Sequence, residues 1–283
     1  MSRDDRMDQP VLGIVAGGGT LPGEIIRHCI DEGRPYFVLA LKGFADPETV
    51  ENTPHHWVRM GAVGKTLRIA RENGVDTIVL AGRVSRPSIT SLMPDAKALK
   101  ILGKSGLRLG DDGLLKSIVI YLEENEGMKV VGIHDVLQDA ASVPPGPLGR
   151  VRVSDEAESD IRRGRDVLDA LARADVGQAV VVQAGLVLGV EAIEGTDALI
   201  TRAGGLKRDG QGPVLVKQPK IGQEERVDLP TIGPDTVERA AEAGFSGIAI
   251  RADGVLIADK EKLIRLADDA GLFVAAFEGA QRD

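Results

Sequence analysis

Short apolar runs alternate with helical patterns through the first half of the chain. The apolar runs, which we expect to be strands, cover 11–17, 35–41, 77–82 and 128–133. The helical patterns between them cover 22–33, 64–74 and 111–127. Strands without alternation, interleaved with helices, indicate a parallel sheet covered on both faces. The pattern therefore predicts an N-terminal, Rossmann-like α/β domain over 11–137.

The second half of the chain predicts a second α/β domain. Residues 138–153 are rich in Pro and Gly and have no period, so we interpret them as an interdomain linker. Residues 154–279 then combine helical patterns with apolar strands, two of them joined by a tight turn at Ala184 and Gly185. The length of 283 residues also suits two domains of roughly 100–200 residues each. The expected fold class is α/β with two domains.

The composition restricts the partners that the protein can have. A net charge of −8 and only 3% aromatic residues argue against binding to nucleic acid. The single cysteine, Cys29, excludes an intramolecular disulfide framework. The first ten residues lack the apolar stretch of a signal peptide, and no apolar run approaches the roughly 20 residues that span a bilayer. We therefore expect a cytoplasmic protein.

Charged and amide side chains crowd into residues 217–233, KQPKIGQEERVDLPTIG. Within a dozen positions this stretch carries Lys217, Lys220, Gln223, Arg226 and Asp228. A structural loop needs turn residues but not this mixture. Cations and amides suit the binding of a phosphorylated substrate, and a carboxylate suits the holding of a metal or a water molecule. The stretch predicts one part of an active site.

A helix is expected directly after this stretch. Gly233 and Pro234 fit its N-cap and first helical position. The N-terminus of such a helix presents free N–H groups and a partial positive charge. We therefore expect Thr231, Gly233 and the turn between them to contribute donors to the substrate.

Two N-terminal loops are candidates for phosphate binding. AGGGT follows the first predicted strand, and its residues Gly17, Gly18, Gly19 and Thr20 suit a turn whose N–H groups approach an anion closely. Its spacing matches neither a dinucleotide fingerprint nor a P-loop, so a tight strand-to-helix turn is the alternative.

The second of these loops is AGRVSRP at 81–87, which follows the third predicted strand. Its side chains Arg83, Ser85 and Arg86 would grip a phosphate at the carboxyl end of that strand. Solvated loop charges are the alternative.

Three carboxylates lie close together in VEAIEGTDALI at 190–200. Glu191 comes just after an apolar strand, and Glu194 and Asp197 follow within seven residues. Magnesium in proteins commonly takes one or two carboxylates together with substrate phosphates, so this trio predicts a Mg²⁺ site. The alternative is a short helix capped by Thr196 with Asp197 in its first turn.

The ordered set of motifs resembles a known family. It includes AGGGTLP, FADP, GKT, AGRVSRP, LMPDA, GDDGLL, GLVLGVEAIEGTDA and K-x-P-K-x-x-Q-E-x-R-V-D-L-P-T-I-G. Together these strings resemble the LpxI family, and the resemblance runs in order from about residue 11 to about residue 277. Each motif alone has low specificity, whereas the set has high specificity.

The resemblance implies an activity. The family consists of UDP-2,3-diacylglucosamine pyrophosphatases of lipid A biosynthesis in Gram-negative bacteria. Its members are Mg²⁺-dependent hydrolases that release UMP and 2,3-diacylglucosamine 1-phosphate (lipid X), with water attacking the β-phosphorus. The resemblance also implies two domains with the substrate between them. The family's key acid corresponds to Asp228.

The residues and the resemblance combine into one hypothesis. Mg²⁺ bridges the diphosphate and is held by Asp228, with one of the carboxylates near residue 191 as a further ligand. The cations of 217–226 neutralise the charge that develops in the transition state. Alternatively, Asp228 orients the attacking water as a general base. The acyl chains suggest an interdomain lipid groove and peripheral contact with the inner face of the inner membrane, and we also expect a homodimer.

Two other functions fit parts of the sequence. A Rossmann-type oxidoreductase that binds a nucleotide sugar or NAD would need an acid at the end of the second strand, which here reads LALKGF. A non-catalytic sensor of a nucleotide-lipid is the other alternative. Carboxylates beside cations disfavour the sensor, because they repel a polyanion unless a metal intervenes.

Overall fold

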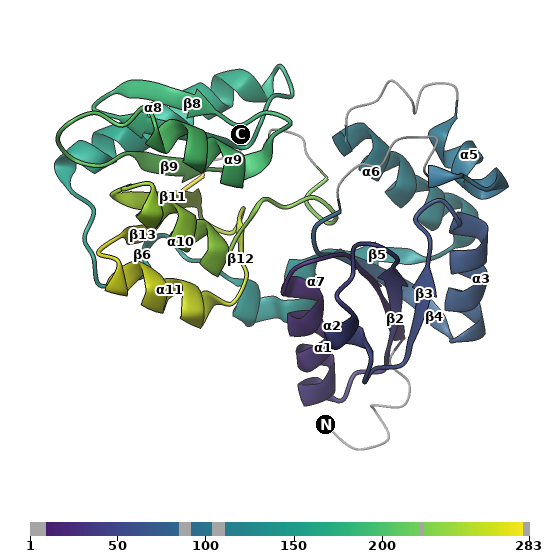
Figure 1. Ribbon diagram of the computed structural model, residues 1–283. Helices are drawn as coiled ribbons and strands as arrows, with labels where there is room; N and C mark the ends of the chain where they lie inside the picture. Colours follow the sequence, from purple (N-terminus) through teal and green to yellow (C-terminus); the bar gives the residue numbers. More distant parts are fainter. Residues whose placement is uncertain (1–9, 85–91, 104–110, 221–223, 280–283) are drawn as a thin grey trace. The chain divides into compact units, whose positions relative to one another are not determined.

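A computed structural model of the protein describes residues 10–84, 92–103, 111–220 and 224–279. Contacts along the chain define two compact units (Figure 1). The N-terminal unit comprises Met1–Ala140 and Arg226–Asp228, and the C-terminal unit comprises Ala141–Glu225 and Leu229–Asp283. Each unit has a hydrophobic core of its own.

A five-stranded sheet forms the centre of the N-terminal unit. Its strands are β1 (Val11–Ala16), β2 (Tyr36–Leu41), β3 (His55–Val58), β4 (Val75–Ala81) and β5 (Lys129–Val131). They pair in the order β3-β2-β1-β4-β5, and every pair is parallel. The chain builds outward from β1 to β3 on one side and then from β4 to β5 on the other. The gap between β1 and β4 is therefore a topological switch point.

Helices cover both faces of this sheet, as the apolar strands predict. They are α1 (Leu21–Glu32), α2 (Pro47–Val50), α3 (Val63–Glu72), α5 (Ala96–Leu102), α6 (Asp111–Ile120) and α7 (Ile133–Leu137), with a π-helical turn η2 (Tyr121–Asn125) and a 3-10 turn η3 (Gln138–Ala141). Helix α1 contacts β1 and α7, whereas α3 contacts β2, β3, β4 and α5 (Figure 1). The expected parallel sheet flanked by helices is confirmed.

The C-terminal unit contains a mixed sheet of six strands. They are β6 (Gly146–Pro147), β7 (Ala179–Gln183), β8 (Leu186–Val190), β9 (Val214–Lys217), β11 (Gly247–Arg251) and β13 (Phe273–Phe277). The order is β6-β13-β11-β9-β7-β8. The three central neighbours β13, β11 and β9 are parallel, and the remaining pairs are antiparallel. A separate pair of short parallel strands consists of β10 (Thr231–Ile232) and β12 (Leu256–Ile257).

Helices also cover both faces of the C-terminal sheet. They are α8 (Asp155–Ala172), α9 (Gly195–Gly204), α10 (Pro234–Glu242) and α11 (Lys260–Asp269). Helix α8 contacts β7 and β9, α9 contacts β7, β8 and α10, and α11 contacts β13 and α10. One core lies beneath α8 and a larger one beneath the other three helices. The second domain is thus α/β, as expected.

The stretch 138–153 is more than the linker expected from its composition. Its Gly146–Pro147 segment pairs antiparallel with β13 as the edge strand β6. Asp253 also accepts a hydrogen bond from the N–H of Val143 at 3.0 Å. Proline is tolerated on an edge strand because one side of that strand needs no ladder donor. Pro and Gly therefore predict the irregular path of this stretch but not its place in the C-terminal sheet.

The predicted tight turn between β7 and β8 is confirmed. Ala184 and Gly185 both have positive φ, at 50° and 75°. Two consecutive residues of positive φ form the hairpin turn that matches the twist of the flanking strands. The buried carboxylate of Asp160 on α8 accepts hydrogen bonds from both turn N–H groups, at 2.9 and 2.7 Å. Asp160 thereby stabilises a turn in which a non-glycine residue adopts an unfavourable φ.

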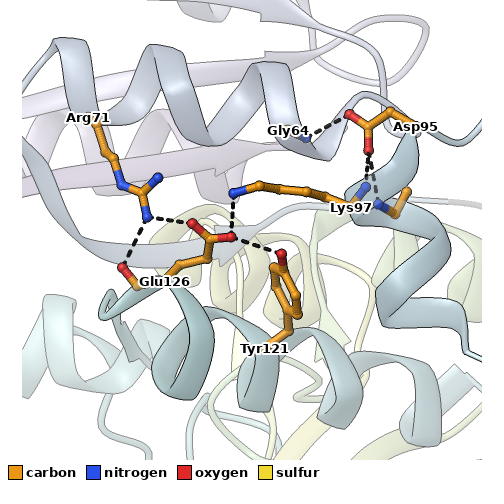
Figure 2. Close-up of polar contacts among 7 residues, drawn as sticks. Gly64, Arg71, Asp95, Lys97, Tyr121 and Glu126 are labelled. Atoms are coloured by element: carbon orange, nitrogen blue, oxygen red, sulfur yellow. Dashed lines mark hydrogen bonds and ion pairs between the residues drawn. The ribbon is translucent and has the colours of Figure 1, made fainter.

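The carboxylate of Glu126 joins three elements of the N-terminal unit (Figure 2). It accepts hydrogen bonds from Arg71 of α3, Lys97 of α5 and, at 2.9 Å, the hydroxyl of Tyr121. The Glu126 side chain is only 5% exposed. Burial by itself would raise the pKa of Glu126, but the hydrogen bonds from Lys97, Tyr121 and Arg71 outweigh it and lower that pKa to about 2. The carboxylate is therefore charged in the folded protein at neutral pH.

Replacing Glu126 with glutamine is expected to lower the free energy of unfolding at pH 7 by about 2 kcal/mol, since two cations lose their shared carboxylate. The folded-state pKa lies below its ordinary value of 4.5, so this stabilisation is complete above about pH 5. It is lost as the pH falls toward 2. Urea unfolding of both proteins at pH 7 and pH 3 measures the difference. Glu72→Gln, on the exposed surface of α3, is the matched control. An equal difference at both pH values would contradict the assignment.

Among the residues described, no helix is long and apolar enough to cross a membrane.

Candidate active site

Two of the predicted loops meet at the carboxyl edge of the N-terminal sheet. One follows β1 and the other follows its neighbour β4. The N–H of Gly18 donates to the carbonyl of Arg83 at 2.9 Å, and the N–H of Arg83 donates to the carbonyl of Gly18 at 2.7 Å. The N–H of Gly17 donates to the carbonyl of Ala81 at 2.8 Å. The glycine turn and the Arg83 loop are thus joined at the switch point.

Glycine is needed here because the two backbones approach each other closely. A Cβ at Gly17 would lie 2.8 Å from the carbonyl oxygen of Arg83. Gly82 has a φ of +95°, and a Cβ there would lie 2.6 Å from the carbonyl oxygen of Gly18. The structure corrects the expectation that the N–H groups of Gly17 and Gly18 cradle a phosphate, since both already donate within the protein.

The exposed residues that the structure describes at this edge include Gly19, Thr20 and Arg83. A Cβ at Gly19 would lie 3.6 Å from Nε of Arg83, so the guanidinium lies beside the glycine turn. Thr20 is the N-cap residue of α1, and no helix N–H donates to its side chain. A helix N-terminus and a guanidinium thus flank the switch point, where open α/β sheets bind ligands.

Asp228 belongs to the N-terminal unit by its contacts. In the chain it lies within the predicted domain 154–279, but Arg226–Asp228 cluster with the N-terminal unit. Both flanks of this segment cluster with the C-terminal unit. Sequence position alone therefore assigned the acid to a different unit from the one that its contacts define.

The segment that carries Asp228 lies at the carboxyl end of β5. Nη1 of Arg226 donates to the carbonyl oxygen of Val130 at 3.3 Å, and Val227 packs against the core that contains Val130. Strand β5 is the neighbour of β4, so this segment and Arg83 follow adjacent strands of one sheet. The partly buried Asp228 is thus held at the same sheet edge as the glycine turn.

Lys217 ends β9 in the C-terminal unit and is almost completely buried. Its ammonium donates to the hydroxyl of Thr196 at 2.6 Å, and that hydroxyl donates to Oε1 of Glu191 at 2.5 Å. Oε2 of Glu191 accepts from the N–H of Gln178 at 3.0 Å. The three side chains form one largely buried polar cluster at the carboxyl ends of β8 and β9. Thr196 is a bridge in this cluster rather than the helix cap that the sequence suggested.

The other two carboxylates of the predicted metal trio have cationic partners. Glu194 Oε1 accepts from Arg202 at 2.7 Å, and hydrogen bonds from its own backbone N–H and from Arg202 lower the pKa of the Glu194 carboxyl. Asp197 lies 3.5 Å from Arg239. In the part of the chain that the structure describes, no three His, Cys, Asp or Glu side chains are grouped to hold a metal ion. The trio therefore does not form the predicted magnesium site.

Two further residues of 217–220, Gln218 and Lys220, donate hydrogen bonds to carboxylates within the C-terminal unit. Lys220 Nζ donates to Asp175 Oδ1 at 2.7 Å. Gln218, which is not among the predicted site residues, is buried and donates to Asp169 Oδ1 at 2.8 Å. No sequence pattern predicts these partners because each lies more than 40 positions away.

Thr231 and Gly233 lie where the sequence places them, before α10. Gly233 is the N-cap residue and Pro234 the first residue of this helix, which confirms the predicted start. However, the N–H of Gly233 donates to the hydroxyl of Thr236 at 3.2 Å. The Thr231 hydroxyl donates to the carbonyl of Leu229 at 3.3 Å. The predicted Ser85, Arg86 and Gln223 lie outside the described residues.

The fold and this edge define a two-domain α/β protein with a glycine turn, an arginine and an acid at the carboxyl ends of parallel strands. The comparison with known families identifies the chain further. The chain belongs to the LpxI family: residues 11–140 match its N-terminal domain and residues 144–275 its C-terminal domain.

One relative matches almost the whole chain. The UDP-2,3-diacylglucosamine pyrophosphatase LpxI of Caulobacter vibrioides is 43% identical over 279 residues, which cover 96% of this chain and 99% of the relative. Among solved structures, the UDP-glucose 4-epimerase of Thermus thermophilus in complex with NAD covers 96% of this chain and 88% of its own. Its identity of 16% and TM-score of 0.31 are too low to support any conclusion about fold or function.

Proposed function

We propose that this protein hydrolyses the pyrophosphate bond of UDP-2,3-diacylglucosamine to UMP and 2,3-diacylglucosamine 1-phosphate in lipid A biosynthesis. The observation that carries the proposal is the 43% identity to a UDP-2,3-diacylglucosamine pyrophosphatase across 96% of the chain. Identity at this level over nearly the full length of both proteins supports a shared substrate. Membership of the family in both domains supports the same conclusion.

The geometry of the N-terminal unit supports a nucleotide-diphosphate substrate. A parallel sheet in the order β3-β2-β1-β4-β5 is the Rossmann-like arrangement that binds nucleotides at its switch point. The N-terminus of α1 and the Arg83 guanidinium lie at that point, and both favour an anion. The segment that carries Asp228 follows the next strand along the same edge.

In the proposed reaction, a water oxygen attacks the β-phosphorus next to the sugar. The bond from that phosphorus to the bridging oxygen breaks, and UMP leaves with the bridging oxygen and its electron pair. One proton of the water passes to the Asp228 carboxylate as general base and from there to solvent. Arg83 and Lys217, as proposed substrate contacts, would stabilise the negative charge on the phosphoryl oxygens.

The Mg²⁺ requirement implied by the family stays a prediction. The carboxylates at positions 191, 194 and 197 do not fit a metal site, because each has another partner within the C-terminal unit. Asp228 is the remaining protein ligand among the predicted four, and the substrate's phosphates would have to supply further oxygens. Mg²⁺ would neutralise phosphate charge when bound.

The setting of the enzyme follows from its substrate. A lipid with a soluble nucleotide head is reached from the water side of a membrane. We therefore propose a cytoplasmic enzyme that contacts the inner face of the inner membrane peripherally. A homodimer is part of the same proposal, and sedimentation at several protein concentrations would test it.

Incubating the purified protein with UDP-2,3-diacylglucosamine in ¹⁸O-labelled water tests the proposal. We expect UMP and 2,3-diacylglucosamine 1-phosphate in equal amounts, with Mg²⁺ required and EDTA inhibitory. Mass spectrometry should find the label in the lipid phosphate, because water attacks the β-phosphorus. Label in UMP would contradict the site of attack.

The same assay separates the alternative functions. Tight substrate binding without UMP release would indicate the nucleotide-lipid sensor. An oxidoreductase would be stabilised against heat by NAD, whereas the hydrolase should show no such change.

A further inference from the structure

We propose that Arg226 is a positioning residue that fastens the segment 226–228 to the N-terminal unit and so holds Asp228 in place. The sequence predicts that Arg226 binds the substrate. The structure gives its guanidinium an internal partner instead. The inference rests on the proposed function only in taking Asp228 as the acid that carries the chemistry.

The segment is too short to hold itself in place. Glu225 and Leu229 belong to the C-terminal unit, so only three residues cluster with the N-terminal unit before the chain returns. Arg226 and Val227 lie in a turn, and none of the three residues belongs to a helix or strand. A segment without secondary structure opens readily unless side-chain contacts keep it ordered. Its contacts with the N-terminal unit therefore decide how well Asp228 is ordered.

The first such contact is an ion pair with the π-helical turn η2. Nη1 of Arg226 donates to Oε1 of Glu123 at 2.7 Å and to the carbonyl of Val130 at 3.3 Å. The same oxygen of Glu123 accepts from the N–H of Val130 at 3.3 Å. One carboxylate thus joins the guanidinium to the backbone of β5. Both side chains are about one-third exposed, at 37% for Arg226 and 35% for Glu123.

Two packing contacts accompany the ion pair. Val227 packs against the core that contains Leu122, Met128 and Val130. The backbone of the segment also lies close to the turn between β5 and α7, because a Cβ at Gly132 would lie 3.3 Å from Cα of Arg226. The N–H of Gly132 in turn donates to a carboxylate of α7 at 2.8 Å. Arg226 and Val227 therefore contact the C-terminal part of β5 and the turn that follows it.

The contacts of Arg226 restrict the position of Asp228 because only a short length of chain separates the two residues. Two residues of extended backbone span at most about 7 Å, so Asp228 cannot move far while Arg226 is held. Once Arg226 is released, displacements of an ångström or more are open to it. Misplacement by about 1 Å can lower a rate by about 100-fold. A positioning role therefore predicts loss of kcat, whereas a substrate contact predicts a raised KM.

Kinetics of three variants test this distinction. For Arg226→Ala and Glu123→Gln we expect kcat to fall about 10- to 100-fold, with KM within about twofold of the unmodified protein. The double variant should be no slower than Arg226→Ala, because both changes break one interaction. Glu124→Gln, which changes the exposed neighbouring acid on η2, is the matched control and should leave kcat unchanged.

Hydrogen exchange supplies a readout that does not depend on activity. Peptides that cover 224–230 should exchange about 10-fold faster in Glu123→Gln than in the unmodified protein, and at an unchanged rate in Glu124→Gln. Glu123→Gln preserves side-chain size, so it remains informative if Arg226→Ala fails to fold.

Two results would overturn the assignment. One is a raised KM in Arg226→Ala while Glu123→Gln behaves as the unmodified protein, and the other is unchanged exchange in Glu123→Gln. If the unmodified protein releases no UMP, the proposed function fails. The exchange rates alone then decide whether Arg226 holds the segment 226–228 in place.

Discussion

Replacing Asp228 with asparagine is expected to lower kcat about 10³-fold. Asparagine has nearly the same shape but can neither accept the proton of the attacking water nor offer a full negative charge to a metal. Both proposed roles of Asp228 therefore predict the same loss. UMP release under saturating substrate measures it.

Glu225→Gln is the matched control for this experiment. Glu225 is also acidic and lies three positions away, but it forms an ion pair with Arg251 at 3.3 Å in the C-terminal unit. A single ion pair with one partner partly exposed to solvent contributes little to stability, so this variant should keep its fold and rate. Near-normal kcat in Asp228→Asn would exclude both the general-base and the metal-ligand role.

Replacing Lys217 with methionine is expected to lower kcat/KM about 100-fold. Lys217 is only 5% exposed at the end of β9, and its ammonium is held by the hydroxyl of Thr196, so little entropy would be lost when it meets a phosphate. The same change leaves the buried carboxylate of Glu191 without a nearby cation, and it should also lower the free energy of unfolding by about 3 kcal/mol. Steady-state kinetics and urea unfolding measure the two effects separately.

Lys262→Met, on the exposed face of α11, controls for the loss of one positive charge and should match the unmodified protein in both assays. Full activity together with reduced stability in Lys217→Met would show that Lys217 is structural only.

Glu191→Gln adds a test of the metal prediction. Because Glu191 is bonded to Thr196 and Gln178, we expect this variant to need no more Mg²⁺ than the unmodified protein.

Much of the fold could be predicted because burial leaves a direct pattern in the sequence. Strands β1, β2, β4 and β5 coincide with apolar runs, since a strand covered on both faces is mostly apolar rather than alternating. Strand β3 has no apolar run and is not predicted by the sequence pattern. It reads HHWV and lies at the edge of the sheet, where only Val58 is buried. The two-residue strands β6 and β10 are too short to produce any period.

The candidate site was predicted less completely. The charges of 217–233 are adjacent in the chain, and this adjacency predicts a single surface. The structure divides it, with Lys217 and Lys220 bonded inside the C-terminal unit and Arg226–Asp228 assigned to the N-terminal unit. Likewise, the carboxylates at 191, 194 and 197 are close in sequence but each bonds a different partner. Proximity in the chain does not determine which side chains meet.

The sequence by itself determined the fold class, the start of α10, the hairpin at Ala184 and the family, because these depend on local spacing and ordered motifs. Only the tertiary structure decided what the polar residues do. Gly17 and Gly82 allow two loops to approach closely, and Thr196 connects Lys217 to Glu191 by hydrogen bonds. Arg226 forms an ion pair with Glu123. The physical reason is that a buried or half-buried charge must find a partner, and that partner comes from whichever distant segment the fold brings within hydrogen-bond distance.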